Sequence, residues 1–256
     1  MRAEDVFDLS DEVALITGGG TGIGFAIARV LAANGAKVAL IGKEQAHLDA
    51  AAETIMGQGG AVMGISLDVR REDRIAACYD RIEEAFGAVG VLVNAAGVAH
   101  RDKAMSLSAE TLRNVMAVNV EGAVMMAQEA ARRMVRAGRG GSIVNVSSVL
   151  SELPMRQVAA YSASKAALSQ MTRCLALEWA KHNIRVNEIR PGWFQTALTE
   201  PFLKGPGAGV MANQNPLGRL GQSHDLDGAV LLLASRASAY MTGSVLTVDG
   251  GHSLLR

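Results

Sequence analysis

Seven short apolar runs that alternate with longer helical patterns constrain the fold of this chain more than any other feature. The runs lie at 13–17, 38–41, 61–66, 89–94, 142–147, 184–189 and 244–248. The segments between them, rich in Ala, Leu, Arg and Glu, have helical character near 23–34, 44–57, 71–86, 109–137, 158–181 and 223–234. Nearly continuous apolar strands separated by helices predict an α/β fold with a parallel sheet covered on both faces.

The length of the chain fits a single domain. It has 256 residues, 49% of them hydrophobic, and no internal repeat, low-complexity tract or linker divides it. We therefore expect one domain over 1–256. The stretch 192–221 is different, because it carries Gly and Pro without sustained periodicity and is long for a connection. Such a segment is typical of a lid over a substrate or of a binding element, or else of a disordered loop.

Charge and cysteine content exclude several classes of protein. Lys and Arg together number 25, as do Asp and Glu, so the surplus of basic charge typical of nucleic-acid binding or membrane attraction is missing. We expect a small-molecule ligand. Cys78 and Cys174 lie far apart, without neighbours at metal-ligand spacing, so we expect no metal site and no disulfide. With no apolar leader and no run of about 18 apolar residues, the chain is predicted to be cytoplasmic.

A glycine-rich turn follows the first apolar run. In TGGGTGIG (17–24), Gly18, Gly22 and Gly24 precede a helical segment, so the backbone can turn tightly and approach a pyrophosphate at a helix N-terminus. An ordinary tight turn is the alternative interpretation. The position of the motif between a predicted strand and a predicted helix favours dinucleotide binding.

The end of the second predicted strand bears on which dinucleotide binds. An acidic residue there would bind the ribose 2′-hydroxyl, whereas a basic residue would accept a 2′-phosphate. The strand ends in Gly42 and Lys43, so no carboxylate opposes a phosphate, and NADP(H) is favoured over NAD(H). Lys43 as a solvated loop residue remains the alternative, and the glycine turn carries Thr21 where a second base could have assisted.

Tyr161 and Lys165 are spaced to share one face of a helix. Side chains at i and i+4 are neighbours, so the Lys165 ammonium is expected to favour the phenolate and to lower the pKa of Tyr161. Ser148 ends the fifth apolar run, at the sheet edge where parallel α/β folds bind ligands. These three side chains predict acid/base chemistry on a substrate oxygen; an incidental amphipathic pair is the alternative.

From the glycine turn to the C-terminus, the chain resembles the short-chain dehydrogenase/reductase family in its form of about 250 residues. The matching motifs follow the family's order and spacing. They are TGGGTGIG (17–24), DV (68–69), NAAG (94–97), VNV (118–120), SS (147–148), YSASK (161–165), VN (186–187), PG (191–192) and YMTGSVLTVDGG (240–251). The resemblance implies a doubly wound, Rossmann-type sheet of seven parallel strands in a single domain, assembled as a homotetramer.

The resemblance also implies four catalytic residues. Tyr161 resembles the general acid/base and Lys165 the partner that lowers its pKa and binds the nicotinamide ribose. Ser148 resembles the residue that orients the carbonyl and stabilises charge on its oxygen. Asn119 resembles the residue that holds a water in the proton relay.

For the cofactor, the resemblance implies contacts along the whole groove. Asp68 is similar to the residue at the adenine amino group, Asn94 to one on the adenosine side, and the 191–196 segment to the turn that grips the carboxamide. Ala95 stands where the family motif usually has a second Asn, which removes an amide near the cofactor. The implied set is Gly18, Thr21, Gly22, Ile23, Gly24, Lys43, Asp68, Val69, Asn94, Ala95, Gly97, Tyr161, Lys165, Pro191, Gly192, Phe194 and Thr196.

The substrate pocket is expected between the segment after Ser148 and the segment after Pro191. The main candidates are Ser148, Leu150, Met155, Tyr161 and Trp193. Ordinary packing is the alternative for the apolar members. Further candidates are Leu153, Phe202, Leu203 and Met211, with His100, Arg156 and Lys204 as polar additions.

Charged residues raise two further questions. Glu188 and Arg190 stand in the strand before Pro191, where family members mostly carry small or apolar residues, and they predict either a same-face ion pair or a role for Arg190 toward cofactor or an acidic substrate. The basic run 132–139 suggests either an acyl-carrier docking patch or a helix C-terminus stabilised by its dipole.

The predicted function is an NAD(P)-dependent oxidoreductase that prefers NADPH and interconverts a ketone and a secondary alcohol. Reduction of a 3-oxoacyl thioester is an alternative within the same family. A catalytically silent dinucleotide-binding regulator is an alternative of another class, against which the intact set of Asn119, Ser148, Tyr161 and Lys165 argues.

Overall fold

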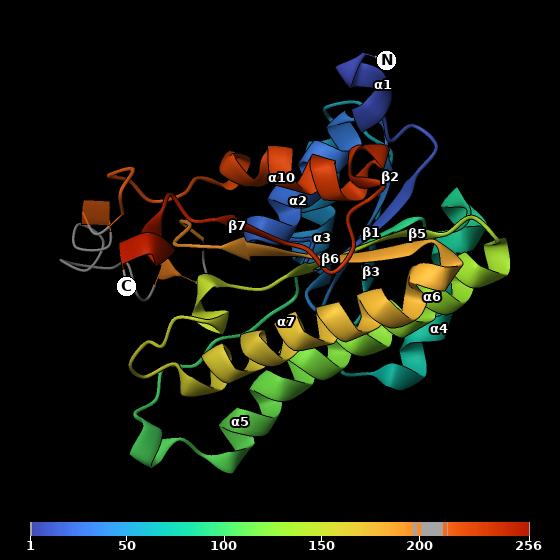
Figure 1. Cartoon of the computed structure of the whole chain (residues 1–256). Coiled ribbons are helices and arrows are strands. Elements are labelled where there is room, and N and C mark those ends of the chain that lie inside the picture. The colour runs from blue at the N-terminus through green and yellow to red at the C-terminus, as the bar shows by residue number, and fades with distance from the viewer. Residues whose placement is uncertain (1, 197–198, 201–211, 214, 256) are drawn as a thin grey trace.

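A computed structural model describes residues 2–196, 199–200, 212–213 and 215–255. Its centre is one parallel sheet with the strand order β3-β2-β1-β4-β5-β6-β7 (Figure 1). The strands are β1 Val13–Thr17, β2 Lys37–Gly42, β3 Val62–Ser66, β4 Val91–Asn94, β5 Gly141–Val146, β6 Ile184–Pro191 and β7 Val245–Val248. The order reverses between β1 and β4, as in a doubly wound Rossmann-type fold, so the predicted fold class is confirmed.

Helices cover both faces of the sheet, as Figure 1 shows. On one face α2, α3 and α10 pack into one buried apolar cluster, and on the other face α4, α6 and α7 pack into a second. The sheet is therefore buried from both sides, which explains why its strands are apolar without alternation. The helices are α1 Ala3–Phe7, α2 Gly22–Ala33, α3 Gln45–Met56, α4 Glu72–Phe86, α5 Ala109–Met116, α6 Ala123–Ala137, α7 Ala159–Trp179 and α10 Asp227–Ala234.

The elements agree with the sequence pattern to within a few residues, with three differences. The pattern at 109–137 is divided into α5 and α6 by a π-helical turn, Ala117–Gly122. Hydrophobic periodicity does not reveal such a local change in helical winding. The segment at 223–234 begins as a 3₁₀ turn, Ser223–Leu226, before α10. The short helix α1 was not predicted.

Part of the 192–221 segment, including Phe202, Leu203, Lys204 and Met211, lies outside the described residues, and its role as a lid stays a prediction. Across the described part of the chain, no helix combines the length and the apolar character needed to cross a membrane.

The basic run 132–139, at the end of α6, is largely neutralised within the fold. Arg133 is buried between α4 and α6, and its guanidinium lies 2.7 Å from carboxylate oxygens of both Glu129 and Glu83 and 2.8 Å from one of Asp80. Its guanidinium carbon also lies 5.3 Å from the ring centre of Tyr79. The adjacent Arg132 is exposed and reaches Glu129 only at 3.4 Å. One arginine therefore joins two helices, while its neighbour contacts one.

Replacing Arg133 by Ala is expected to lower the free energy of unfolding by about 3 kcal/mol, because it leaves partly buried carboxylates without their cation. Arg132→Ala is the matched control, with an expected loss below about 1 kcal/mol for an exposed ion pair. Urea unfolding at one fixed protein concentration measures both. Equal losses in the two variants would show that the Arg133 cluster does not hold α4 against α6.

Candidate active site

The carboxyl ends of β1 and β4 open a groove at the point where the strand order reverses. Parallel α/β sheets bind ligands at such a point because the loops that follow the two strands diverge there. Two adjoining cavities meet at this edge and share Gly18, Thr21, Ala96 and Gly97 in their walls. The second cavity shares Ser148, Tyr161, Gly192 and Thr199 with a third. The three form one continuous groove from β2 to β6.

The glycine turn forms the floor of this groove. Gly18 and Gly22 have φ of +67° and +56°, a region in which other residues are strained. A Cβ at Gly24 would collide with the carbonyl group of Gly18, so the helix can begin this close to the strand only with glycine there. Thr21, the N-cap residue of α2, makes no side-chain capping hydrogen bond in the described part of the chain. These features fit a dinucleotide whose pyrophosphate accepts hydrogen bonds from the first turn of α2.

The far end of the groove, beside β2 and β3, contains both charges and a neutral strand end. Lys43 is exposed, and its ammonium lies 4.0 Å from the Asp68 carboxylate. Arg70 binds the same carboxylate through its guanidinium and donates a hydrogen bond of 2.9 Å to Asn114. The hydrogen bond from Arg70 is the main cause that lowers the pKa of Asp68. Lys43 and Arg70 therefore line the same end of the groove as Gly42, the end of the second strand, beside which a 2′-phosphate would lie.

Ser148, after β5, and Tyr161 and Lys165, on α7, meet at the middle of the groove. Ser148 follows the end of β5, and its hydroxyl accepts a hydrogen bond from the Leu150 amide. The Lys165 ammonium is buried, donates to the Val146 carbonyl at 2.8 Å and lies 5.7 Å from the ring centre of Tyr161. The predicted trio therefore converges on one point.

Burial governs the proton affinities of this trio. It raises the pKa of Tyr161, and a hydrogen bond with Ser148 opposes that rise. Burial also lowers the pKa of Lys165, while the charge of Glu188 acts to raise it, and the resulting pKa is about 8. The expectation that Lys165 holds the pKa of Tyr161 below its ordinary value is not met in this structure. The ammonium is bound by a carbonyl group, and desolvation is the larger effect.

Asn119 lies in the π-helical turn, with its side chain fully engaged. Its amide nitrogen donates to the Val98 carbonyl at 3.0 Å and to the Ser164 hydroxyl at 2.9 Å, while its amide oxygen accepts from the Val98 backbone at 2.8 Å. A Cβ at Gly97 would lie 3.4 Å from the Asn119 amide oxygen and 3.5 Å from the Lys165 ammonium. Gly97 therefore separates Asn119 from Lys165 by little more than the space of one methyl group.

The β6 end of the groove is apolar. Leu150, Met155 and Trp193 line its last cavity together with Ser148 and Tyr161, as the sequence predicts. The Trp193 ring also packs edge-on against His252, with ring centres 6.5 Å apart. Leu153 does not line this cavity but packs against the cluster behind its wall, which includes Val149, Leu150 and Val158. His100 lies in a separate surface depression.

Most of the predicted cofactor residues line the groove. Those beside the glycine turn, the trio and the turn after β6 are Gly18, Thr21, Gly22, Ile23, Gly24, Ala95, Gly97, Tyr161, Lys165, Pro191, Gly192, Phe194 and Thr196, and those at the β2 end are Lys43, Asp68 and Val69. Asn94 lies below the groove, where its amide donates to the Ala123 carbonyl and to Asn145. Asn94 therefore supports the groove from inside the sheet.

Sequence reasoning missed two residues that shape the groove. Arg70 lies only two residues after Asp68, and its basic side chain was the signal that could have identified it. The hydroxyl of Thr17 accepts hydrogen bonds of 3.1 Å from the backbone of both Ala95 and Ala96, so it holds the loop after β4 against the glycine turn. No sequence signal distinguishes this threonine from others at a strand end.

The predicted ion pair between Glu188 and Arg190 is confirmed. The Arg190 Nε atom lies 3.1 Å from Glu188 Oε1, and both side chains are buried on the face of β6 that packs against α7. Neither residue lines the groove in the described part of the chain.

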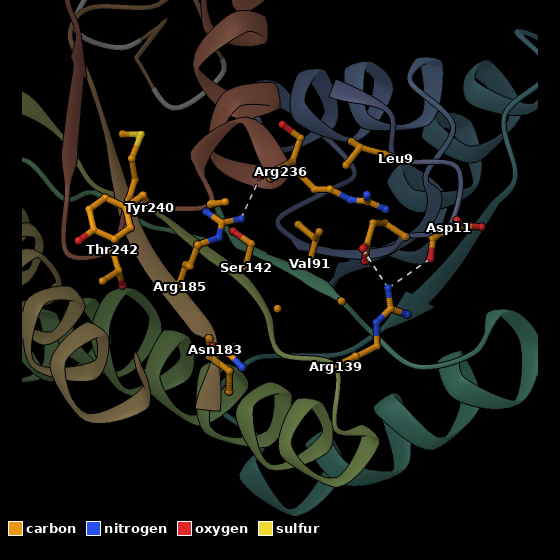
Figure 2. Close-up of a pocket in the computed structure, with 18 of the residues that line it drawn as sticks. Leu9, Asp11, Val91, Arg139, Ser142, Asn183, Arg185, Arg236, Tyr240 and Thr242 are labelled. Carbon is orange, nitrogen blue, oxygen red and sulfur yellow. Dashed lines mark hydrogen bonds and ion pairs between the residues drawn. The ribbon is translucent and has the colours of Figure 1, made fainter. Parts of the chain in front are cut away.

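A cavity of about 700 Å³, larger than any of the three that form the groove, lies at the opposite edge of the sheet. Figure 2 shows residues from the starts of the strands around it, including Val91 and Ser142. Two of the arginines that line it are engaged within the protein: Arg139 pairs with Glu12, and Arg185 donates to the Leu233 carbonyl and the Ser238 hydroxyl. Size alone does not identify the site here. The smaller groove has the glycine cradle and the titratable trio.

Comparison with known proteins supports this choice. A family model described as enoyl-(acyl carrier protein) reductase matches residues 18–253. Gluconate 5-dehydrogenase of Gluconobacter oxydans (strain 621H) is 36% identical over 252 residues, which cover 98% of each chain. Galactitol 2-dehydrogenase (L-tagatose-forming) of Cereibacter sphaeroides is 39% identical over 258 residues, which cover 99% of this chain and 100% of the relative.

A solved structure agrees over almost the whole chain. It is a gluconate 5-dehydrogenase from Burkholderia cenocepacia J2315 in complex with NADP and tartrate, with a TM-score of 0.94, 34% identity and 99% of each chain covered. The range matched by the family model spans Gly18, Ser148, Tyr161 and Lys165. The chain therefore belongs to the short-chain dehydrogenase/reductase family and is an oxidoreductase that acts on CH–OH groups.

Proposed function

We propose that this enzyme prefers NADP(H) and interconverts a secondary hydroxyl and a ketone on a polyol or a sugar acid. The observation that carries the proposal is the continuous groove, which joins the glycine cradle at α2 to Ser148, Tyr161 and Lys165. A nicotinamide cofactor supplies the hydride when it is bound, and the protein must supply a proton donor and a charge stabiliser beside the carbonyl.

Each member of the trio has a role that follows from its surroundings. Tyr161 is protonated at neutral pH because burial raises its pKa, so its hydroxyl donates a proton to the oxygen of a ketone under reduction. The Ser148 hydroxyl donates a hydrogen bond to the same oxygen and stabilises its developing charge. Lys165 compensates the negative charge that Tyr161 acquires. In the oxidation direction the phenolate of Tyr161 accepts the proton from the alcohol.

The substrate class is supported by the named activities of the relatives, which oxidise gluconate and galactitol. A 3-oxoacyl thioester is a weaker candidate, because the basic run that suggested a carrier-docking patch is largely paired: Arg133 is buried among carboxylates, and Arg136 and Arg139 lie near Glu83 and Glu12. A patch whose cations are already compensated attracts an acidic carrier weakly.

The preference for NADP(H) is supported by the exposed ammonium of Lys43 beside the neutral Gly42. Two solved relatives, the Burkholderia enzyme and one from Beutenbergia cavernae, have NADP bound. The Arg70 guanidinium adds positive charge nearby, although Asp68 compensates much of it.

A cytoplasmic homotetramer is also part of the proposal. Cys78 and Cys174 are unpaired, which suits a reducing compartment. Leu177 on α7 and Tyr240 before β7 are strongly exposed, and a second copy of the chain would cover such side chains. Light scattering after gel filtration tests the assembly.

A substrate panel tests the function directly. Purified protein is expected to reduce NADP⁺ with gluconate, galactitol or a related polyol, and to oxidise NADPH with L-tagatose. Little turnover is expected with acetoacetyl-CoA. Preferential turnover of the thioester would reject the proposed substrate class, whereas binding of NADPH without turnover of any compound would point to a regulatory role.

Replacing Tyr161 by Phe is expected to lower kcat by about 10²–10⁴-fold, because the proton donor is lost. NADPH affinity should change little, since the hydroxyl is not needed to fill the groove. Tyr240→Phe is the matched control, because it removes the same hydroxyl from a tyrosine that does not line the groove. Steady-state kinetics and NADPH fluorescence measure the two effects. A Tyr161→Phe enzyme within a few fold of the parent would disprove the assignment.

Replacing Lys43 by Asp is expected to lower kcat/KM for NADPH by roughly tenfold or more and to spare NADH, because a carboxylate replaces the cation near the 2′-phosphate. Lys37→Asp is the control, since Lys37 begins the same strand at the opposite edge of the sheet. The ratio of kcat/KM for the two cofactors is the measurement. An unchanged ratio would make Lys43 a solvated surface residue.

A further inference from the structure

A buried carboxylate faces the catalytic helix from the neighbouring strand. Glu188, in the middle of β6, has no exposed surface, and its Oε1 accepts a hydrogen bond from Arg190 Nε at 3.1 Å. Its Oε2 accepts none within the described part of the chain. Moving a carboxylate out of water costs on the order of several kcal/mol, so an acidic side chain is rarely buried unless another group compensates its charge.

Arg190 fixes the position of this carboxylate. Besides Glu188, its guanidinium contacts the Ser169 hydroxyl on α7 at 3.2 Å and the Glu152 carboxylate at 2.7 Å. Glu152 lies four residues after Ser148 and is mostly exposed. Arg190 therefore joins β6, α7 and the segment that follows Ser148, through contacts with Ser169 and Glu152 that do not involve Glu188.

The geometry directs Glu188 toward Lys165. Tyr161, Lys165 and Ser169 follow one another at four-residue intervals, so they form one stripe of α7. Lys165 donates to the Val146 carbonyl on β5, and the neighbouring Asn145 is the register partner of Glu188. Arg190, on the same face of β6 as Glu188, reaches Ser169 on that stripe. Glu188 thus lies under the turn of α7 that carries Lys165.

The reaction creates a need for such a charge. Burial raises the pKa of Tyr161 and lowers that of Lys165 to about 8, so it favours the neutral forms of both groups. Proton transfer from Tyr161 leaves a phenolate beside the Lys165 ammonium, and burial disfavours both of these charged forms. The titratable and charged groups on this side of Lys165 are Tyr161 on its own helix, Glu188 and Arg190 on β6, and Glu152, which pairs with Arg190. Glu188 is the one whose charge raises the pKa of Lys165.

We propose that Glu188 is a positioning residue for the reaction, whose buried carboxylate keeps Lys165 in the ammonium form that compensates the charge of Tyr161. Arg190 holds the carboxylate in place and shields it from the solvent side. This inference rests on the proposed function of Tyr161 and Lys165 and goes beyond it, because Glu188 contacts neither substrate nor cofactor groove.

The test compares Glu188→Gln with Glu152→Gln. Both remove one negative charge from the same network and keep the side-chain shape, but only Glu188 is buried opposite Lys165. Protein labelled with ¹³C at the lysine ε carbons reports the titration of Lys165 without any substrate, and a Lys165→Met sample assigns the signal. The Lys165 midpoint is expected to fall by about one pH unit in Glu188→Gln and by no more than a few tenths in Glu152→Gln.

Ketone reduction with NADPH gives a second readout. If the Lys165 midpoint falls from about 8 to about 7, the ratio of parent to Glu188→Gln kcat should grow from below about twofold at pH 6.5 to about tenfold at pH 9. A purely structural role would lower kcat at every pH by a similar factor. Glu188→Ala, which leaves Arg190 bound to Glu152 and Ser169, should shift the profile in the same direction.

The outcomes separate this inference from the proposed function. An unchanged Lys165 midpoint in Glu188→Gln, or an equal shift in Glu152→Gln, would overturn the role of Glu188. Failure of both Glu188→Gln and Glu188→Ala to fold would also overturn it and assign the residue to stability. If no compound of the panel is turned over, the proposed substrate class fails, but the ¹³C titration still decides whether Glu188 controls Lys165.

Discussion

The packing of α7 against β5 and β6 is the contact on which the site depends. It buries Lys165 beside the Val146 carbonyl and brings Tyr161 to Ser148, which follows the end of β5. Because α7 runs from the carboxyl edge of the sheet toward the amino edge, its first turns lie over the groove and its later turns lie over the core. The same helix face therefore carries Tyr161 and Lys165, the groups proposed for catalysis, at one end and packing groups at the other.

The cofactor groove follows from a different constraint, the reversal of strand order between β1 and β4. The loops after these strands must approach one another without closing the gap between them. Glycines at 18, 22 and 24 allow the first loop to pass close to α2, and the Thr17 hydroxyl holds the second loop through two backbone amides. The replacement of the usual Asn by Ala95 leaves this arrangement intact, since the contact uses the backbone of Ala95 and not its side chain.

Buried charges recur in this fold, and each is handled by a small network. Arg133 is surrounded by three carboxylates between α4 and α6, where its role is to join helices. Arg190 is held by Glu188, Ser169 and Glu152 next to the site. Both networks centre on a buried arginine, but they differ in place. Arg190 binds Ser169 on the helix that carries Lys165, whereas Arg133 binds residues of α4 and α6.

The sequence alone determined the class of fold, the glycine cradle and the trio of Ser148, Tyr161 and Lys165, because these depend on local patterns: apolar runs, fixed turn conformations and the i, i+4 spacing of one helix. It also anticipated the pairing of Glu188 with Arg190, two residues apart on one strand. Only the tertiary structure decided what those charges act on. Three features depend on elements far apart in the chain: the desolvation of Tyr161 and Lys165, the hydrogen bond between Asn119 and Val98, and the approach of Glu188 to α7. Burial and distance are properties of the packed molecule, so the local spacing of residues does not contain them.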